Sequence, residues 1–357
     1  MMIMRRNRAR LTAFAAICCL VLIIANLRFI LSTGASVFGL RTSPAPRWPS
    51  AADSSNLASS SWNYTQAGHK GCQAYPAEDS DMVIVVKTGA TEVFNKLPAQ
   101  LLTFLQCAKN DLLILSDLEQ DIADYHIYDC LTNVTEVVKF NNSDFDLYEA
   151  QKRVKLMGED IIAMGNRGSQ GWALDKYKNI HTARKAWELR PNKSWYFFID
   201  ADTYVFWSSF VPWLKRHDPS KRLYLGSKVP NDPPFAHGGS GYALSRGAMK
   251  QLVGKDGSQV AADFDMMVKD DCCGDKVLGI LLKQKQISLR NWDPLISGQK
   301  PRRMGFGPKL WCQPVITYHH MSPEEINEMW QFELRRTNAK VSFCFVVVQL
   351  FAPQNKC

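Results

Sequence analysis

The sequence WYFFIDADTYVFW, at residues 195–207, runs five bulky apolar residues directly into the carboxylates of Asp200 and Asp202. An aromatic and β-branched run of this kind predicts a buried strand whose aromatic residues belong to the core. On extended backbone, side chains two residues apart point to the same side. Paired carboxylates offer hard oxygen ligands, which suit Mg²⁺ or Mn²⁺. The stretch therefore predicts a metal site at the end of a buried strand.

The spacing of these two carboxylates is common, so the strand before them carries the argument. The same Asp-x-Asp spacing occurs at three other places: Asp79/Asp81, Asp144/Asp146 and Asp263/Asp265. A loop cap or a solvated turn would also explain two nearby carboxylates. Only at Asp200 does a strongly apolar run lead into the pair, and both interpretations stay open on this evidence.

The composition is that of a globular protein. The chain has 357 residues, of which 46% are hydrophobic and 22% charged, enough for one large or two modest domains. Of the net charge of +9, four charges lie in an arginine-rich start within residues 5–10, which leaves about +5 for the rest. That remainder does not indicate nucleic-acid binding, although a mildly basic surface would suit an anionic substrate.

Residues 11–31 are nearly all apolar, with Asn26 and Arg28 as the strong interruptions. A run of roughly 20 such residues can cross a bilayer, and the arginines before it would keep the N-terminus in the cytosol. A cleaved signal peptide is the alternative, because residues 32–36 could supply a cleavage site. We expect an uncleaved, single-pass type II anchor with the body of the protein in the lumen.

The chain divides into five expected segments. They are a cytosolic tail (1–10), a transmembrane anchor (11–31), a flexible luminal stem rich in Ser, Ala and Pro (32–75), a folded domain (76–335) and an atypical C-terminal tail (336–357). The apolar, β-prone stretch 341–351 in the tail is either a last buried strand or the product of altered splicing.

Two further features agree with a luminal body. Glycosylation sequons occur beyond the anchor at four positions: Asn63, Asn133, Asn141 and Asn192. Eight cysteines also lie beyond it: Cys72, Cys107, Cys130, Cys272, Cys273, Cys312, Cys344 and Cys357. In an oxidising lumen several of these should pair, and Cys107 with Cys130 is our expected pair. The absence of Cys-x-x-Cys argues against a zinc ribbon.

Strands and helices are expected to alternate, which predicts a parallel sheet with helices on its faces. Expected strands lie at 81–87, 111–116, 126–128, 195–199 and 223–227, with a late strand within 310–318. Expected helices lie at 91–107, 146–164, 172–189, 246–252, 276–284 and 323–336, with loops at 166–171 and 230–234. Ser245 suits the N-cap of its helix, and Lys176 and Lys178 are expected on a solvated helix face.

The stretch HGGSGYALS, at residues 237–245, has three glycines in four positions. Glycine lets the backbone approach a ligand closely or adopt positive φ. We expect Gly239 and Gly241 to bring the backbone close to a bound substrate. A plain hairpin turn is the alternative.

Six motifs follow one another along the chain. They are Lys87-Thr88 after an early strand, GWALDKYK at 171–178, Asp-Ala-Asp at 200–202, Gly-Gly-Ser-Gly-Tyr at 238–242, GDKVLG at 274–279 and TYHH at 317–320. This ordered set, over roughly residues 80–335, resembles glycosyltransferase family 31, the Fringe and core 1 β-1,3-galactosyltransferase group, particularly its fungal relatives. The resemblance implies an α/β GT-A fold, a Rossmann-like nucleotide-sugar-binding domain whose mixed central sheet is flanked by helices.

The resemblance also implies metal ligands. Asp202 matches the family's metal-binding carboxylate, and Asp200 matches the position nearer the donor's ribose. The middle Asp of the family's Asp-Asp-Asp segment is Ala201 in this chain. His319 matches a late metal-ligand histidine, whereas His320 has no assigned counterpart. From the residues alone, a core histidine that binds a backbone carbonyl is the favoured interpretation of His319.

The remaining site assignments rest on the same resemblance. Asp275 matches the family's catalytic base, although Gly274 replaces its acidic neighbour. Thr88 and Asp175 match donor-contact positions. From the residues alone, Asp275 could instead be the N-cap of the helix that starts at Lys276.

The expected function is that of an inverting, Mn²⁺-dependent hexosyltransferase at the Golgi membrane. It would move a hexose, galactose in β-1,3 linkage by resemblance, from a UDP-sugar to a glycan or glycoprotein hydroxyl. One alternative is a non-catalytic relative that acts as a chaperone or glycan-binding protein. The other is a metal-dependent phosphoesterase, which would need more clustered His and Asp. No nucleic-acid partner is expected, the N-terminal helix would bind the membrane, and a homodimer is one possible assembly.

Overall fold

The computed structural model describes residues 71–76, 81–165, 167–304 and 314–336. The expected membrane anchor, most of the stem, the sequon at Asn63 and the apolar stretch 341–351 lie outside these ranges. Within them, none of the helices combines the length and apolar character that a bilayer crossing needs.

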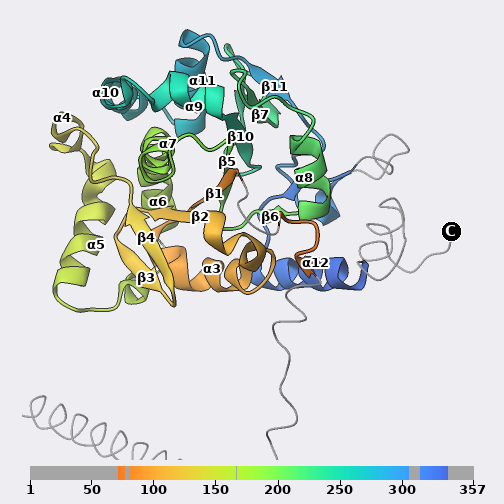
Figure 1. Ribbon diagram of the computed structural model, residues 1–357. Coiled ribbons are helices and arrows are strands. Elements are labelled where there is room, and N and C mark those ends of the chain that lie inside the picture. The colour runs from red at the N-terminus through yellow and green to blue at the C-terminus, as the bar shows by residue number, and fades with distance from the viewer. Residues whose placement is uncertain (1–70, 77–80, 166, 305–313, 337–357) are drawn as a thin grey trace, which may run out of the picture. The chain divides into compact units, whose positions relative to one another are not determined.

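A mixed sheet of eight strands lies at the centre of the described residues (Figure 1). In spatial order its strands are β11 (Leu289–Asn291), β7 (Tyr224–Gly226), β10 (Tyr242–Ser245), β5 (Trp195–Asp200), β1 (Met82–Lys87), β2 (Leu112–Ser116), β4 (Tyr125–Asp129) and β3 (Gln120–Ile122). β5, β1, β2 and β4 are parallel, but β10 pairs antiparallel with both β5 and β7. The mixed sheet implied by the family resemblance is therefore confirmed, whereas the parallel sheet expected from the strand–helix alternation holds only for these four strands. No helix lies between β7 and β10, so the chain does not cross over and the two strands run antiparallel.

The central strands are buried on both faces, which is why they are continuously apolar. In β5, Trp195, Phe197 and Ile199 pack into one hydrophobic cluster. Tyr196 and Phe198 pack into the cluster on the opposite face. The predicted buried strand with core aromatic residues is thus confirmed.

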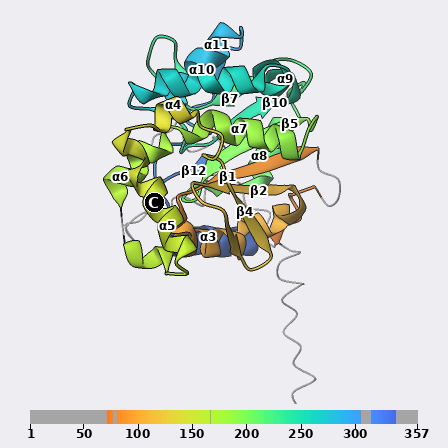
Figure 2. The same ribbon diagram turned by 90° about the vertical axis from the view of Figure 1, so that its left-hand side faces the viewer.

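Helices cover both faces of the sheet, and Figures 1 and 2 show α3 and α12 on the side opposite α9, α10 and α11. The first face carries α3 (Val93–Leu101), α8 (Trp207–Leu214) and α12 (Pro323–Arg336). The second carries α4 (Glu136–Lys139), α5 (Asp146–Leu156), α6 (Gly168–Asp175), α7 (Lys178–Leu189), α9 (Arg246–Val253), α10 (Gly257–Lys269) and α11 (Gly274–Gln284). This is the mixed α/β architecture of helices flanking a central sheet, and it is consistent with a GT-A-like fold.

Short elements complete the described chain. Two small antiparallel pairs are β6 (Tyr204–Val205) with β12 (Thr317–Tyr318), and β8 (Lys228–Val229) with β9 (Phe235–Ala236). The 3₁₀ turns are η2 (Ala90–Glu92), η3 (Phe104–Asp111), η4 (Ser143–Phe145), η5 (Ile161–Met164) and η6 (Pro301–Arg303). β12 is the late strand expected within 310–318. It is shorter than that range and comprises only Thr317 and Tyr318.

The helices differ from expectation at three places. The expected helix 172–189 is split into α6 and α7 by a turn at Lys176–Tyr177, and α6 includes part of the expected loop 166–171. The expected helix 146–164 ends at Leu156, before Gly158 at φ 71°. α10 was not anticipated. The helices after Ser245 and Ser322 are confirmed, and the Ser245 side chain accepts from the Ala248 amide as an N-cap.

The expected Cys107–Cys130 disulfide is wrong. Cys107 instead pairs with Cys72, and Cys130 is a buried free thiol. Cys107 packs against the hydrophobic cluster on one face of the sheet, whereas Cys130 belongs to the cluster on the other. The sheet therefore separates the two sulfur atoms. A second disulfide joins Cys272 to Cys273.

Candidate active site

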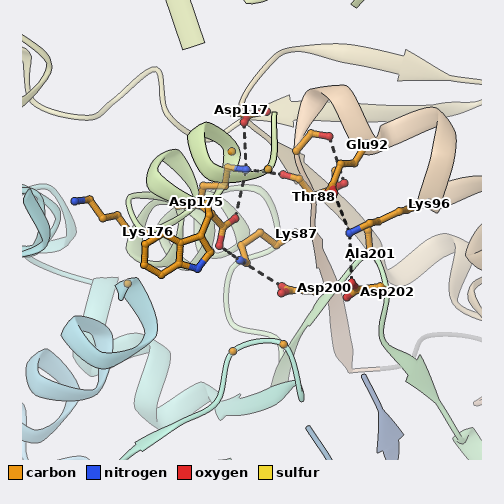
Figure 3. A pocket seen from close by; sticks show the side chains of 18 of the residues that line it. Lys87, Thr88, Glu92, Lys96, Asp117, Asp175, Lys176, Asp200, Ala201 and Asp202 are labelled. Carbon is orange, nitrogen blue, oxygen red and sulfur yellow. Dashed lines mark hydrogen bonds and ion pairs between the residues drawn. The ribbon is translucent and has the colours of Figure 1, made fainter. Parts of the chain in front are cut away.

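A cavity of about 710 Å³ lies where the carboxyl ends of β1 and β5 meet the start of α11 and the glycine loop at 237–241. Register places Lys87, the last residue of β1, beside Asp200, the last residue of β5. Figure 3 shows their side chains entering this cavity with those of Asp175 and Asp202. In sheets of this kind, the carboxyl ends of parallel strands are the usual ligand-binding edge.

Two predicted metal ligands, Asp202 and His319, lie together with the neighbouring residue His320 at one end of the cavity. Ligand atoms of Asp202, His319 and His320 all lie within 4.8 Å of one another. The His319 Nε2 is 3.1 Å from the Asp202 Oδ1, so its partner is a carboxylate and not a backbone carbonyl. His320 adopts φ 59°, a conformation uncommon outside glycine, and this presents its ring beside that of His319.

The donor set fits a divalent cation that accepts both oxygen and nitrogen, as Mn²⁺ does. The His319 Nδ1 is buried and has no hydrogen-bond partner among the described residues. Lys96 on α3 reaches the same carboxylate, with its Nζ 3.3 Å from the Asp202 Oδ2. Burial alone would raise the pKa of Asp202, but the hydrogen bond to His319 and the charge of Lys96 hold it well below its usual range. The Asp202 carboxylate is therefore ionised, as a metal ligand would need to be.

Asp200 and Asp202 lie at the same edge of the cavity because a turn follows Asp200. The alternation of side chains along a strand does not place them there. β5 ends at Asp200, and the Thr203 amide donates to the Asp200 carbonyl at 3.0 Å. The extended strand assumed from the sequence therefore ends two residues before Asp202. Each carboxylate also has its own lysine, with Lys87 beside Asp200 and Lys96 beside Asp202 (Figure 3).

Lys87 is the central cation of the cavity floor. It forms ion pairs with Asp175 from α6 and with the Asp200 Oδ1, the latter at 3.4 Å. Burial would lower the pKa of Lys87, but these two carboxylates hold it above its usual range. Asp175, predicted as a donor contact, thus lies in the cavity already paired to a cation.

Lys178 continues this network behind Thr88, and its expected place on a solvated helix face is wrong. Its Nζ donates to the Thr88 carbonyl at 2.8 Å and lies 3.3 Å from the Asp117 Oδ2. Asp117 also accepts the Ala90 amide at 2.6 Å. Lys176 is not solvated either, since it pairs with Asp144 at 2.9 Å. Both lysines are held by tertiary partners that helical periodicity does not reveal.

Asp275 lies on the other side of the cavity, in the first turn of α11. The helix begins at Gly274 after an N-cap at Cys273, so the N-cap alternative for Asp275 is wrong. Its Oδ2 accepts the Gly238 amide at 3.0 Å, and its Oδ1 accepts the Lys276 amide at 2.9 Å. Burial, opposed by these two amides, raises the pKa of Asp275. Such a carboxylate binds a proton more readily than an exposed one.

The glycine loop joins the two sides of the cavity. The Gly241 amide donates to the Gly238 carbonyl at 3.0 Å, and Gly241 adopts φ 86°, so a turn is present. Gly239 packs against His319, where a Cβ would lie 2.2 Å from the imidazole Nε2. The backbone at Gly239 therefore closely approaches the side chain of His319, which is a metal-ligand candidate of the same chain.

The sequence analysis named His320 without giving it a role, and it missed two other polar residues of this site, Lys96 and Asp117. Asp117 had a usable signal, because it follows β2 directly and β2 is parallel to its neighbour β1. Lys96 had none, since its place beside Asp202 depends on how α3 packs.

Residues 77–328 match the family model described as Fringe-like. A search of curated proteins finds no match to the chain.

Proposed function

The chain belongs to the Fringe-like family of glycosyltransferases, and we propose that it transfers a hexose from a UDP-sugar to a hydroxyl group of a glycan or glycoprotein. The proposed reaction inverts the anomeric centre, requires Mn²⁺ and forms a β-1,3 linkage, with galactose as the first candidate sugar. The proposed setting is the lumen of the Golgi, with the enzyme held in the membrane by residues 11–31.

One observation carries this proposal. The glycine loop contacts a metal-ligand candidate on one side and a base candidate on the other. Gly239 packs against His319, and the next residue towards the N-terminus, Gly238, donates its amide to Asp275. A sugar donor bound over this loop would lie between the two groups that hexosyl transfer needs.

The metal side would bind the donor's diphosphate. Asp202, His319 and His320 would hold the ion, whose positive charge stabilises the UDP leaving group. Lys96 adds a cation at the same carboxylate. Asp200, Asp175 and Thr88 line the adjoining wall, where we propose that they contact the nucleoside part of the donor.

The base side would activate the acceptor. We assign Asp275 the task of taking the proton from the attacking hydroxyl. The raised pKa of Asp275 makes it a stronger base. The two hydrogen bonds that it accepts from backbone amides fix the orientation of its carboxylate. A single attack from the face opposite UDP inverts the anomeric centre.

The alternative function, a non-catalytic glycan-binding protein or chaperone, is motivated by the atypical C-terminal tail and by two departures from the family pattern, Ala201 and Gly274. Both departures fit their surroundings. Ala201 is 3% exposed and packs in the core. At Gly274 a Cβ would lie 2.1 Å from the Lys176 carbonyl oxygen, so no side chain would fit there. The departures are therefore compatible with a folded catalytic site.

Turnover of UDP-hexoses tests the proposal. We expect the purified protein to release UDP from UDP-galactose, UDP-glucose or UDP-N-acetylglucosamine in the presence of acceptor, and chelation of Mn²⁺ to abolish release. Asp202→Ala and Asp275→Asn should each lower kcat at least about 100-fold. The matched control is Asp124→Asn, an 83% exposed carboxylate, which should retain activity.

The thermal melting temperature separates the alternatives, because a bound ligand stabilises the folded state. A donor that raises the melting temperature with Mn²⁺ but is never turned over would favour the non-catalytic alternative. Full activity of Asp202→Ala would refute the metal site, and full activity of Asp275→Asn would refute the assigned base.

A further inference from the structure

The short loop that joins α10 to α11 carries a disulfide between the neighbouring residues Cys272 and Cys273. Both cysteines line the cavity, and Cys272 is exposed. Asp275 follows two residues after this disulfide. The loop therefore connects the redox state of two accessible sulfur atoms to the proposed base.

The first half of the loop is held by polar contacts. Lys176 donates to the Lys269 carbonyl at 3.0 Å and to the Asp271 carbonyl at 3.2 Å. The Asp271 carboxylate accepts the amides of Cys272 and Cys273 at 2.7 and 3.2 Å. These contacts orient the backbone that enters the disulfide, and they depend on the conformation of those two residues.

The second half of the loop positions Asp275, the proposed base. Lys276 pairs with the Asp271 Oδ2 at 2.7 Å, which folds the start of α11 back onto the loop. Gly274 packs directly on the backbone of the α6–α7 junction. Asp275 can then accept the Gly238 amide at 3.0 Å. A rotation of the backbone at the disulfide would move Asp275 away from the glycine loop, because nothing but Gly274 lies between them in sequence.

A disulfide between neighbouring residues closes a small ring that contains the peptide bond joining them, so it restricts backbone rotation at both. We propose that the Cys272–Cys273 disulfide is a positioning element for Asp275 and that its reduction slows hexosyl transfer by releasing the base from the glycine loop. This inference rests on the proposed function of Asp275. It makes the enzyme sensitive to dithiol reductants of its compartment.

Reduction by dithiothreitol tests the chemistry. The reductant's two thiols lose two electrons and two protons and form a cyclic disulfide, while each cysteine sulfur gains one electron and one proton. We expect kcat to fall by about 10- to 100-fold, the cost of a misplaced catalytic group, with the donor KM changed by no more than about twofold. Phenylarsine oxide binds both thiols of a neighbouring pair. It should therefore restrict backbone rotation at the reduced cysteines again and keep them from re-oxidising.

Two double variants assign the effect to this disulfide. Cys272→Ser with Cys273→Ser should have the low kcat of the reduced enzyme and no further response to dithiothreitol. Cys72→Ser with Cys107→Ser removes a disulfide whose cysteines do not line the cavity, and this variant should keep the wild-type kcat and the full response. A wild-type kcat in the first variant, or a dithiothreitol response that persists there, would overturn the inference.

Hydrogen exchange gives a readout that needs no turnover. The amides of Gly238 and Lys276 both donate to Asp275, so reduction should speed their exchange while amides of β1 and β5 stay protected. Faster exchange without any UDP-sugar turnover in the wild type would uphold the positioning role and refute the proposed function. Unchanged exchange at both amides would refute the positioning role whatever the activity.

Discussion

At the scale of single residues, the cavity floor is built from charges that are buried in pairs. The side chains of Lys178 and Asp117 are only 2% and 1% exposed, and they lie 3.3 Å apart. Removing one member of such a pair leaves the other charge buried without compensation. The network behind Thr88 therefore contributes to stability as well as to the shape of the proposed donor site.

Lys178→Met should lower the free energy of unfolding by about 3–5 kcal/mol, because Asp117 would stay buried without its counter-charge. Urea denaturation followed by circular dichroism measures this loss. The matched control is Lys152→Met. Lys152 pairs with Glu149, and both side chains are 49% exposed, so this variant should lower the free energy of unfolding by less than about 1 kcal/mol. Equal losses in the two variants would contradict the buried-pair account.

The pH dependence of activity follows from the raised pKa of Asp275, whose main cause is burial. A base must be ionised, so kcat/KM should rise with pH through a midpoint above the usual range of an aspartate. His237 and Lys87 face the same carboxylate and oppose the shift. The unfolded chain loses this proton at lower pH than the folded one, so ionisation of Asp275 also lowers stability as pH rises through that interval.

A pH–rate profile measured with saturating Mn²⁺ checks this expectation. Dithiothreitol or Cys272→Ser with Cys273→Ser should move the midpoint towards ordinary aspartate values if the carboxylate becomes more exposed. An acid limb at the ordinary aspartate pKa in the wild type would argue against Asp275 as the base.

At the scale of elements, the glycine loop and β12 define the metal side together. The Thr317 hydroxyl at the start of β12 donates to the Ser240 carbonyl at 2.7 Å, and the Thr203 hydroxyl donates to the Gly239 carbonyl at 2.7 Å. These bonds hold the loop against both the Asp202 turn and the His319 segment. The loop therefore lies between two segments that are distant in sequence and contacts both.

Gly239→Ala should weaken Mn²⁺ binding at least about tenfold, because the new methyl group would displace the His319 ring that lies against the loop. Electron paramagnetic resonance of free Mn²⁺ measures the affinity without any turnover. Gly171→Ala is the control, since it also lines the cavity but has no atom within 4 Å of the added carbon. Unchanged Mn²⁺ affinity with an unchanged melting temperature would rule out His319 as a ligand.

At the scale of the whole molecule, the proposed membrane anchorage stands on sequence alone, whereas the folded domain offers a test of luminal location. Asn133, Asn141 and Asn192 are all exposed on the described domain, so each could carry a glycan in the lumen. None of the three asparagines lines the cavity.

In a eukaryotic cell we expect the protein to stay with membranes after carbonate extraction and to shift in mobility on treatment with an N-glycosidase. Replacement of all three exposed asparagines by glutamine should remove most of that shift. Release by carbonate would support a cleaved signal peptide, and a protein without glycans would place the domain outside the secretory lumen.

Much of the fold could be predicted because its signals are local. The apolar runs of β1, β2 and β5 are continuous, since each strand is buried on both faces, and the Ser245 cap precedes its helix directly. Helix interruptions were harder to predict. The turn at Lys176–Tyr177 has no glycine or proline, and it is where the backbone of α10–α11 packs against the chain.

The sequence by itself determined the family, the mixed α/β class that it implies and the identity of the chemical groups, from the Asp200–Asp202 segment to His319 and Asp275. Only the tertiary structure decided which groups meet: His320 beside Asp202, Lys178 beneath Thr88, and Cys72 instead of Cys130 on Cys107. The physical reason is range. Periodicity and turn chemistry act over a few residues, whereas ion pairs, disulfides and ligand clusters depend on how distant elements pack.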